Sequence, residues 1–293
     1  MAKQKSKLNK FTFGKSGKLT DFETEIAPLY SNDDEYDEKF DAVKDELGDL
    51  QDVLYADARY GVLLIFQGMD TSGKDGAIKR IMSCFNPMGV QVSAFSSPTL
   101  EERRHDFLWR THVKMPSRGK IAAFNRSYYE EVTTVRVHPE FLDGQSLPPE
   151  HRKGDRIWTD RLEDIVGHEL YLYRQGYRII KFFLHLSKGE QKKRLLSRID
   201  EPKKNWKFDP SDIKARGSWA RYQKAYDECL KATSRPEAPW YVIPADDKKN
   251  ARLLMAEIVR DELASLPLKY PSVSAEQKRE LEHARKILME SSR

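Results

Sequence analysis

The feature that most constrains the fold is an apolar run that leads directly into a glycine-rich loop. Residues 62–66 (VLLIF) are apolar without interruption, and residues 68–74 (GMDTSGK) hold two glycines and a lysine. Residues 77–82 then continue as a helix. An uninterrupted apolar strand is typical of a parallel sheet that is covered on both faces. The sequence therefore predicts a strand, a loop and a helix in succession.

The rest of the chain repeats the alternation of apolar runs and amphipathic segments. We expect further strands at residues 90–95, 120–124, 178–186 and 240–243. We expect helices at residues 33–59, 155–175, 188–199, 211–233, 248–265 and 274–291, and one that follows Pro98 with Thr99 as its cap. Strands that alternate with helices of this length form a parallel sheet. The predicted fold class is therefore α/β, with three layers in the order α/β/α.

Composition and charge set the limits of this domain. The chain has 293 residues, a formal net charge of +5 and two cysteines. No uninterrupted apolar stretch of about 18 residues occurs, which argues against a membrane span, and the lysine-rich start lacks the apolar core of a secretory signal. Two cysteines exclude a disulfide scaffold and favour a cytoplasmic location.

We expect a single large domain with two extensions. Residues 1–32 form a basic and then acidic N-terminal extension, whose first 20 residues carry six lysines and no acid and are predicted to be a solvated tail. Residues 33–270 form the domain, and residues 271–293 form a C-terminal helical extension. The helix at 33–59 and the terminal helix are the candidate contacts of a homo-oligomer.

The glycine-rich loop matches the phosphate-binding pattern G-x-x-x-x-G-K. Its glycines allow main-chain N–H groups to face a phosphate, the following helix contributes its positive dipole end, and Lys74 supplies a mobile ammonium group. The residues expected to bind phosphate or nucleotide here are Gly68, Met69, Thr71, Ser72, Gly73, Asp75 and Gly76.

Two carboxylates distinguish this loop from the usual pattern. Asp75 replaces the Ser or Thr that normally follows the lysine, and Asp70 lies inside the loop. Asp70 is expected to hold Mg²⁺ or to face an acceptor phosphate, the alternative being a loop-capping role. For Asp75, capping of the helix and metal binding remain equal alternatives.

A second motif follows the predicted strand at 120–124. Asn125 occupies the place of the acid expected at the strand tip, and Arg126 comes next. An arginine at this edge of the sheet can stabilise charge on a transferring phosphoryl group. Glu130 and Glu131 lie one turn further on. At least one of them is expected to reach the metal or the acceptor, and for Glu131 a solvated helix start is as plausible.

A basic segment follows the fourth predicted strand. Residues 188–216 hold ten basic and five acidic residues, with Trp206 and Phe208 among them. Arg194 and Arg198 are four residues apart and share a helix face. A basic, mobile segment of this kind closes over phosphates and excludes water. We expect a helical lid over about residues 188–220, with Arg198 catalytic and Arg194, Lys203 and Lys207 binding phosphate.

Taken together, three segments resemble the polyphosphate kinase type 2 family, which is related to the thymidylate kinases within the P-loop kinases. They are residues 68–76 (GMDTSGKDG), residues 125–130 (NRSYYE) and the lid segment ending at 202–207 (PKKNWK). The resemblance covers roughly residues 35–265. It implies phosphoryl transfer that depends on Mg²⁺, with Mn²⁺ as a substitute, between inorganic polyphosphate and an adenine or guanine nucleotide.

The resemblance also implies roles for individual residues. Asp70 acts on the acceptor phosphate or its metal, and Lys74 and Arg126 clamp the phosphates. The expected metal-facing residues are Asp70 and Asn125, although many family members have Asp at the latter position. Glu130 stands where members specific for nucleoside diphosphates have Asn, and resembles the subgroup that phosphorylates both AMP and ADP.

Two other functions remain as alternatives. A nucleotide kinase of the thymidylate kinase type would share the fold and the loop, but would use ATP as its donor. A nucleic-acid-binding protein would explain the basic segments. Asp70, Asp75 and Glu130 argue against it because without metal they repel a phosphate backbone.

Overall fold

The molecule is built on one parallel sheet, as predicted. The computed structural model describes residues 8–152 and 154–290. All four strand pairings within the sheet are parallel, and the strand order is β2-β3-β1-β4-β5. The strands are β1 (Gly61–Gln67), β2 (Val90–Ala94), β3 (Ile121–Asn125), β4 (Tyr177–His185) and β5 (Trp240–Pro244).

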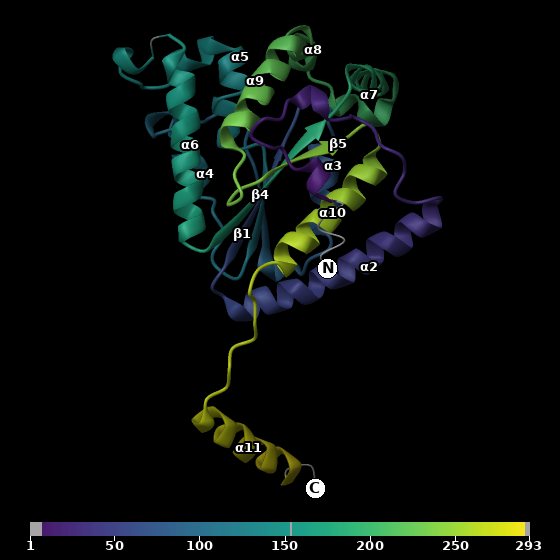
Figure 1. Cartoon of the computed structure of the whole chain (residues 1–293), viewed down its shortest axis with the longest axis vertical. Helices are drawn as coiled ribbons and strands as arrows, with labels where there is room; N and C mark the ends of the chain where they lie inside the picture. The colour runs from purple at the N-terminus through teal and green to yellow at the C-terminus, as the bar shows by residue number, and fades with distance from the viewer. Residues whose placement is uncertain (1–7, 153, 291–293) are drawn as a thin grey trace.

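Helices cover both faces of the sheet and complete the three layers (Figure 1). The side chains of β1 point alternately to the two faces of the sheet: Val62 belongs to the core cluster on one face and Leu63 to the cluster on the other. One face is covered by α2 (Asp33–Asp57), α3 (Lys74–Met82) and α10 (Lys248–Ala264). The other is covered mainly by α6 (Arg156–Arg174) and α9 (Trp219–Thr233). The remaining α-helices are α4 (Trp109–His112), α5 (Thr134–Val137), α7 (Lys188–Asp200), α8 (Pro210–Gly217) and α11 (Ala275–Glu290).

The strand order brings the two predicted motifs together. The central strand β1 lies between β3 and β4, so the chain crosses over β1 when it passes from β3 to β4. Ligands bind at such a reversal, outside the carboxyl ends of the strands. Phe66 of β1 pairs with Asn125 of β3, and the Arg126 N–H donates to the Phe66 carbonyl at 3.0 Å. The glycine-rich loop and the second motif therefore start side by side.

The prediction that the first 20 residues form a solvated tail is wrong for residues 8–20. Phe11, Phe13 and Leu19 are buried in the core clusters, and the Phe13 N–H donates to the Trp240 carbonyl at 2.8 Å. Burial of these apolar side chains anchors the segment, and the neighbouring Lys10, Lys15 and Lys18 remain exposed to water. Residues 1–7, which carry three of the six lysines, lie outside the described residues.

Two helices differ from their predicted bounds. The segment after Pro98 forms only a 3₁₀ turn, Glu102–Arg104. Thr99 does cap it, since its hydroxyl accepts from the Glu102 N–H at 3.2 Å. The turn ends at Arg104. Asp106 then accepts from the N–H groups of Leu108 and Trp109 and starts the next turn. The helix predicted at 211–233 is divided into α8 and α9 at Gly217, because glycine weakens a helix interior.

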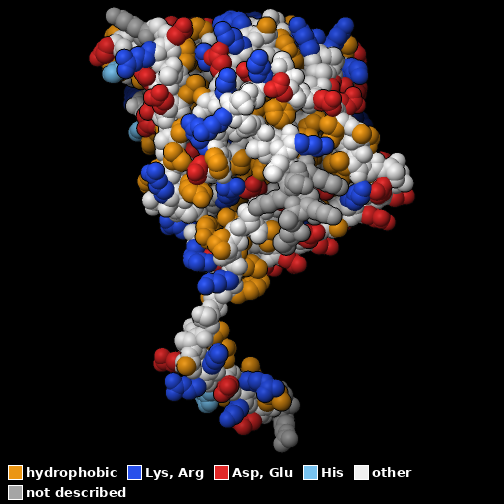
Figure 2. Space-filling view, viewed as in Figure 1, with side chains coloured by type: hydrophobic (Ala, Val, Ile, Leu, Met, Phe, Trp, Pro, Cys, Tyr) orange, Lys and Arg blue, Asp and Glu red, His pale blue; other side chains and the backbone are white. Residues whose placement is uncertain are grey.

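The C-terminal helix α11 stands away from the body, in agreement with a surface position (Figures 1 and 2). Every residue of α11 is exposed, and Figure 2 shows hydrophobic side chains on it. Among the described residues, no helix is long and apolar enough to cross a membrane. Whether residues 1–32 and 271–293 behave as separate extensions stays a prediction.

Replacing Leu47 by Ala should destabilise the fold, because this α2 side chain is 0% exposed. The expected loss is about 2–5 kcal/mol of unfolding free energy, the usual cost of a large-to-small change in a core. The control is Leu281→Ala in α11, where the side chain is 61% exposed. Urea denaturation measures both, and equal effects would contradict the packing described above.

Candidate phosphate-binding site

The glycine-rich loop needs glycine where it leaves β1. Gly68 has a φ of +150°, and a Cβ there would lie 2.8 Å from the Leu184 carbonyl oxygen of β4. Gly73, with a φ of +103°, is the N-cap of α3. Gly76 follows in the first turn of that helix, where a Cβ would lie 2.8 Å from the Arg252 guanidinium. The approach at Gly68 keeps the start of the loop tight against β4.

Lys74 is the first residue of α3 and is buried. Its ammonium group donates to the carbonyl oxygens of Gly68 at 2.8 Å and of Met69 at 3.2 Å. Burial lowers the pKa of Lys74, and the Arg126 charge lowers it further. Met69 itself packs its side chain into the core. The lysine is therefore held inside the loop by neutral acceptors.

Two hydroxyl groups of the loop are buried without a partner. Neither Thr71 Oγ1 nor Ser72 Oγ has a hydrogen-bond partner within the described parts of the chain. Buried polar groups are normally satisfied, and the free N–H groups at the start of α3 also favour an anion. A phosphate group in the loop would provide acceptors for both hydroxyls.

Arg126 faces the loop from the end of β3, as predicted. Its Nη2 lies 2.9 Å from Asp70 Oδ1, and the two side chains are partly exposed. The Glu130 carboxylate raises the pKa of Arg126 above its usual range, and Asp70 adds to this effect while burial opposes it. The structure thus brings Asp70, Lys74, Arg126 and Glu130 into one site.

Glu130 and Glu131 have different surroundings. The Glu130 carboxylate accepts from the Thr134 hydroxyl at 2.6 Å. With its amide in the better-satisfied orientation, Gln67 donates to the other Glu130 oxygen at 2.9 Å. Glu131 is buried and forms an ion pair with Arg161 at 2.9 Å. Glu130 therefore remains the candidate for substrate contact, and Glu131 holds the surrounding structure.

Asp75 and Asn125 contact each other beside the loop. Asn125 Nδ2 donates to Asp75 Oδ1 at 2.6 Å. The described residues contain no group of three or more His, Cys, Asp and Glu residues arranged to hold a metal. Mg²⁺ commonly takes only one or two carboxylates and completes its shell with substrate phosphates and water. Asp70, Asp75 and Asn125 offer the oxygen ligands that such a shared metal needs.

Arg194 lies beneath the loop rather than in front of it. Its Nη1 donates to the carbonyls of Thr71 and Ser72, both at 3.0 Å, and its Nη2 donates to those of Ala245 and Asp246. Its Nε donates to Glu190 at 2.9 Å. All five N–H groups are engaged, so this geometry supports a role in holding the loop.

No described hydrogen bond or ion pair joins the side chains of the remaining predicted lid residues to the loop itself. Arg198 forms an ion pair with Asp212 at 2.8 Å, which joins α7 to α8. Lys203 and Lys207 lie on the exposed 3₁₀ turn Pro202–Lys207, and Lys207 lies over the Trp206 ring at 5.0 Å. Their predicted contacts with substrate stay predictions.

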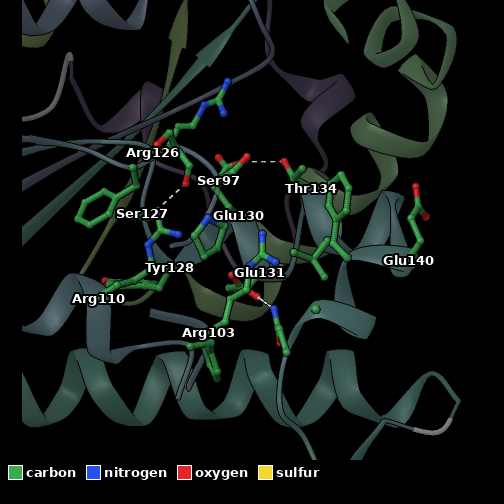
Figure 3. A pocket seen from close by; sticks show the side chains of 18 residues that line it. Ser97, Arg103, Arg110, Arg126, Ser127, Tyr128, Glu130, Glu131, Thr134 and Glu140 are labelled. Carbon is green, nitrogen blue, oxygen red and sulfur yellow. Dashed lines mark hydrogen bonds between the residues drawn. The ribbon is translucent and has the colours of Figure 1, made fainter. Parts of the chain in front are cut away.

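A cavity of about 360 Å³ opens next to Arg126 and Glu130 (Figure 3). It is lined by aromatic rings and further arginines: Phe95, Phe107, Phe141, Arg103 and Arg110. This size and mixture suit a small organic ligand with charged groups. Sequence reasoning missed these residues. The only signal was the run at 101–110 (EERRHDFLWR), which mixes basic and aromatic residues.

The parallel sheet, the lysine-bearing loop and the arginine facing it define a phosphotransferase of the P-loop kinase class. The sequence profile of the family described as Polyphosphate kinase 2 (PPK2) matches residues 30–269. The chain belongs to this family. The predicted family, fold and enzyme class are therefore confirmed.

Three similar proteins illustrate the relationship. The ADP-polyphosphate phosphotransferase of Rhodopseudomonas palustris is 45% identical over 97% of this chain and 99% of its own length. The AMP/ADP-polyphosphate phosphotransferase of Meiothermus ruber is 41% identical over 76% of this chain and 79% of its own. The crystal structure of polyphosphate kinase 2 from Arthrobacter aurescens matches with a TM-score of 0.83 at 34% identity, covering 92% of this chain and 94% of that one.

Replacing Lys74 by Ala should lower the catalytic rate by about 10²–10³-fold, the usual effect of removing one group that stabilises transition-state charge. The control is Lys79→Ala, five residues further along α3, where the side chain is exposed. Steady-state rates and circular dichroism of both variants provide the comparison. A Lys74→Ala variant as active as Lys79→Ala would remove the lysine from the site.

Proposed function

We propose that this enzyme transfers a phosphoryl group from the end of inorganic polyphosphate to ADP and to AMP, and uses Mg²⁺. The observation that carries the proposal is the placement of Arg126 and Glu130. They face the phosphate loop on one side and line the aromatic cavity on the other. A donor phosphate in the loop and an acceptor nucleotide in the cavity would meet at these two residues.

The acceptor fits the cavity by its chemistry. The rings of Phe95, Phe107 and Phe141 provide apolar surface for a base, and Arg103 and Arg110 are able to pair with phosphate. Glu130 is the residue on which the resemblance to the subgroup acting on both AMP and ADP is based. The two curated relatives above carry different names, one for ADP and one for AMP and ADP, and the second name agrees with this proposal.

The donor fits the positive charge around the loop. Lys248 and Arg252 lie in the first turns of α10, beside the loop. Burial lowers the pKa of Lys248, and the charges of Arg194 and, more weakly, of Lys204 in the lid lower it further. Clusters of cations of this kind attract a long polyanion. A donor such as ATP needs less basic charge in this region, which makes it the second candidate.

The reaction requires two anions to approach each other. A terminal phosphate oxygen of the acceptor forms a bond to the last phosphorus of polyphosphate, the bond from that phosphorus to its bridging oxygen breaks, and the shortened chain leaves with that oxygen. Lys74 and Arg126 offset the negative charge on the transferred group. Closure of the lid excludes the water that would otherwise hydrolyse the donor.

Mg²⁺ suits the oxygen ligands of the site, with Mn²⁺ as a substitute. Asp70, Asp75 and Asn125 are the residues that would hold it. When bound, the metal supplies positive charge at the phosphate oxygens. In holding the metal, Asp70 would no longer pair with Arg126, and the arginine would be left to bind phosphate.

Two further expectations are retained as parts of the proposal. The enzyme is expected in the cytoplasm, where nucleotides and polyphosphate meet and thiols such as Cys84 stay reduced. It is also expected to form a homo-oligomer, with α2 and α11 as candidate contacts, because α11 exposes apolar residues such as Leu281 and Ile287. No nucleic-acid partner is expected.

A matrix of donors and acceptors tests the proposed reaction. Polyphosphate and ATP, each as the sole donor, are combined with AMP, ADP, GMP and GDP in the presence of Mg²⁺, and products are separated by chromatography. We expect ADP from AMP and ATP from ADP with polyphosphate alone. Transfer only from ATP would replace this proposal with the thymidylate-kinase-type reaction.

Replacing Asp70 by Asn should abolish turnover and leave the fold intact, because the residue lies in a loop outside the core. The matched control is Asp49→Asn, an exposed carboxylate on α2. Removal of Mg²⁺ with EDTA should stop the wild-type enzyme as well, and Mn²⁺ should restore it. An active Asp70→Asn variant, or full activity in EDTA, would show that the metal and its proposed ligand have been misassigned.

A further inference from the structure

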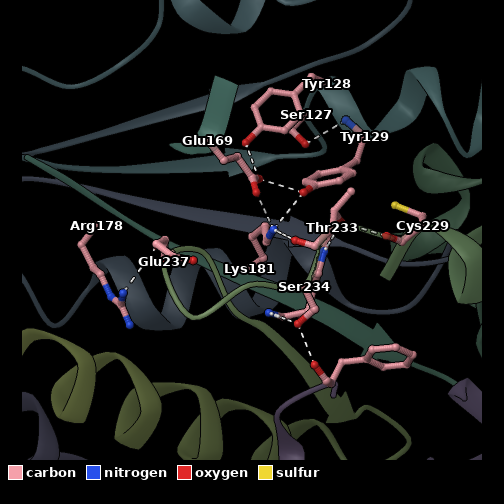
Figure 4. Close-up of polar contacts among 12 residues, drawn as sticks. Ser127, Tyr128, Tyr129, Glu169, Arg178, Lys181, Cys229, Thr233, Ser234 and Glu237 are labelled. Carbon is pink, nitrogen blue, oxygen red and sulfur yellow. Dashed lines mark hydrogen bonds and ion pairs between the residues drawn. The ribbon is translucent and has the colours of Figure 1, made fainter. Parts of the chain in front are cut away.

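A charged cluster is buried in the core behind the active site (Figure 4). Its groups come from four parts of the chain: the side chains of Tyr128, Tyr129, Glu169 and Lys181, and the main-chain carbonyl of Thr233. The Lys181 side chain is 0% exposed and that of Glu169 is 3% exposed. A buried ion pair is costly to form, and hydrophobic residues of similar size would often be as stable. This cost makes a purely stabilising role a poor explanation of the cluster.

Every group in the cluster has its partners. Glu169 Oε2 accepts from Lys181 Nζ at 2.6 Å, and Glu169 Oε1 accepts from the hydroxyls of Tyr128 at 2.8 Å and Tyr129 at 2.7 Å. Lys181 also donates to the Thr233 carbonyl and to the Tyr129 hydroxyl, both at 2.9 Å. A fully satisfied polar network in a core permits one arrangement of its members and opposes others.

Both tyrosines belong to the motif that carries the active-site arginine. They form the 3₁₀ turn Tyr128–Glu131, which follows Arg126 after a single residue and includes Glu130. Ser127 caps this turn by accepting from the Tyr129 N–H at 3.2 Å. The cluster therefore fixes the turn to α6 and β4, at positions two and three residues after the arginine that faces the loop.

Arg126 needs to be held on both sides. Its φ is +64°, a left-handed conformation that is costly for a residue with a side chain. Before it, the β3 strand and the bond from its own N–H to the Phe66 carbonyl fix the chain. After it, Tyr128 and Tyr129 are the first residues that anchor the turn in the core, and the Glu131–Arg161 ion pair anchors its end. Such strain persists only where the surroundings determine the conformation.

We propose that the Glu169–Lys181 pair, acting through Tyr128 and Tyr129, positions Arg126 for phosphoryl transfer. These four are positioning residues for Arg126, since the described contacts bring none of them to the loop. Tyr128 also lines the aromatic cavity, and its change to Phe keeps the ring there while it removes the hydroxyl that donates to Glu169. The proposal rests on the proposed function through the role given to Arg126. It also explains a sequence feature that the prediction of strand 178–186 passed over, a lysine in the middle of the apolar run 179–184 (IIKFFL).

A second buried cluster provides a matched control. The Tyr241 hydroxyl donates to Glu262 Oε1 at 2.5 Å, and Glu262 is also paired with Arg178. The chemistry is the same, a tyrosine on a carboxylate that is paired with a cation. Tyr241 and Arg178 are each the second residue of their strands, so this cluster lies at the edge of the sheet opposite the active site.

The test compares the Tyr128→Phe/Tyr129→Phe double variant with Tyr241→Phe. For each protein, kcat, KM for ADP and the thermal midpoint are measured with polyphosphate and Mg²⁺. We expect kcat of the double variant to fall by about 10²-fold, the scale of a misplaced catalytic group, with little change in KM. Tyr241→Phe should keep its kcat even if it loses thermal stability. If both lower kcat equally, or if the double variant loses only stability, the proposal is wrong.

A double-mutant cycle decides whether the effect passes through Arg126. In an Arg126→Lys background, the two tyrosine changes should have almost no further effect on kcat, because residues that act as a unit are not additive. A full additional loss would contradict the proposal. If the double variant does not fold, Tyr128→Phe and Tyr129→Phe are compared singly by the same criteria. If polyphosphate is not the donor, the wild-type enzyme itself will show no turnover with it. If the positioning role is wrong, the wild-type enzyme will be active and only the kcat values of the variants relative to wild type will differ from those expected.

Discussion

The turn that follows β1 is the constraint on which the site depends. Gly68 places the main chain so close to the Leu184 carbonyl of β4 that no side chain fits. Because of this close approach, the carbonyls of Gly68 and Met69 lie within reach of the Lys74 ammonium group. The loop thus holds a buried cation on neutral acceptors, next to unpartnered hydroxyls and a helix N-terminus. A phosphate group satisfies all of these at once.

The charges of the site are balanced by partners that a substrate can replace. Arg126 is paired with Asp70, and Lys74 is bound by carbonyl oxygens. In the proposed reaction, phosphate and metal would replace these contacts, so the protein would not have to create a desolvated charge at that moment. Arg194 is different, because its donors all face the protein. Its role is to keep the loop in place while the other contacts change.

Much of the fold follows from local patterns in the sequence. The runs of apolar residues predict all five strands to within a residue or two, and the motif G-x-x-x-x-G-K places the phosphate loop at the right edge of the sheet. Arg126 and Glu130 were also predictable, since they follow a strand whose tip must lie at that edge. Local patterns did not predict the position of a segment where contacts with distant parts of the chain determine that position. The lysine-rich start packs through Phe11 and Phe13, and the proximity of Arg194 to the loop depends on the docking of α7. The aromatic cavity and the Glu169–Lys181 cluster join distant segments. The run at 101–110 and the lysine within 179–184 are unusual in the sequence, but no spacing shows which segments they contact.

The central claim is that the loop at residues 68–74 holds the phosphate that is transferred. Diffraction from crystals grown with inorganic triphosphate and Mg²⁺ tests this claim most directly. The account predicts a terminal phosphate against the loop, within hydrogen-bond distance of Lys74 and of an Arg126 that has left Asp70. An empty loop, with the triphosphate bound elsewhere on the molecule, would contradict it.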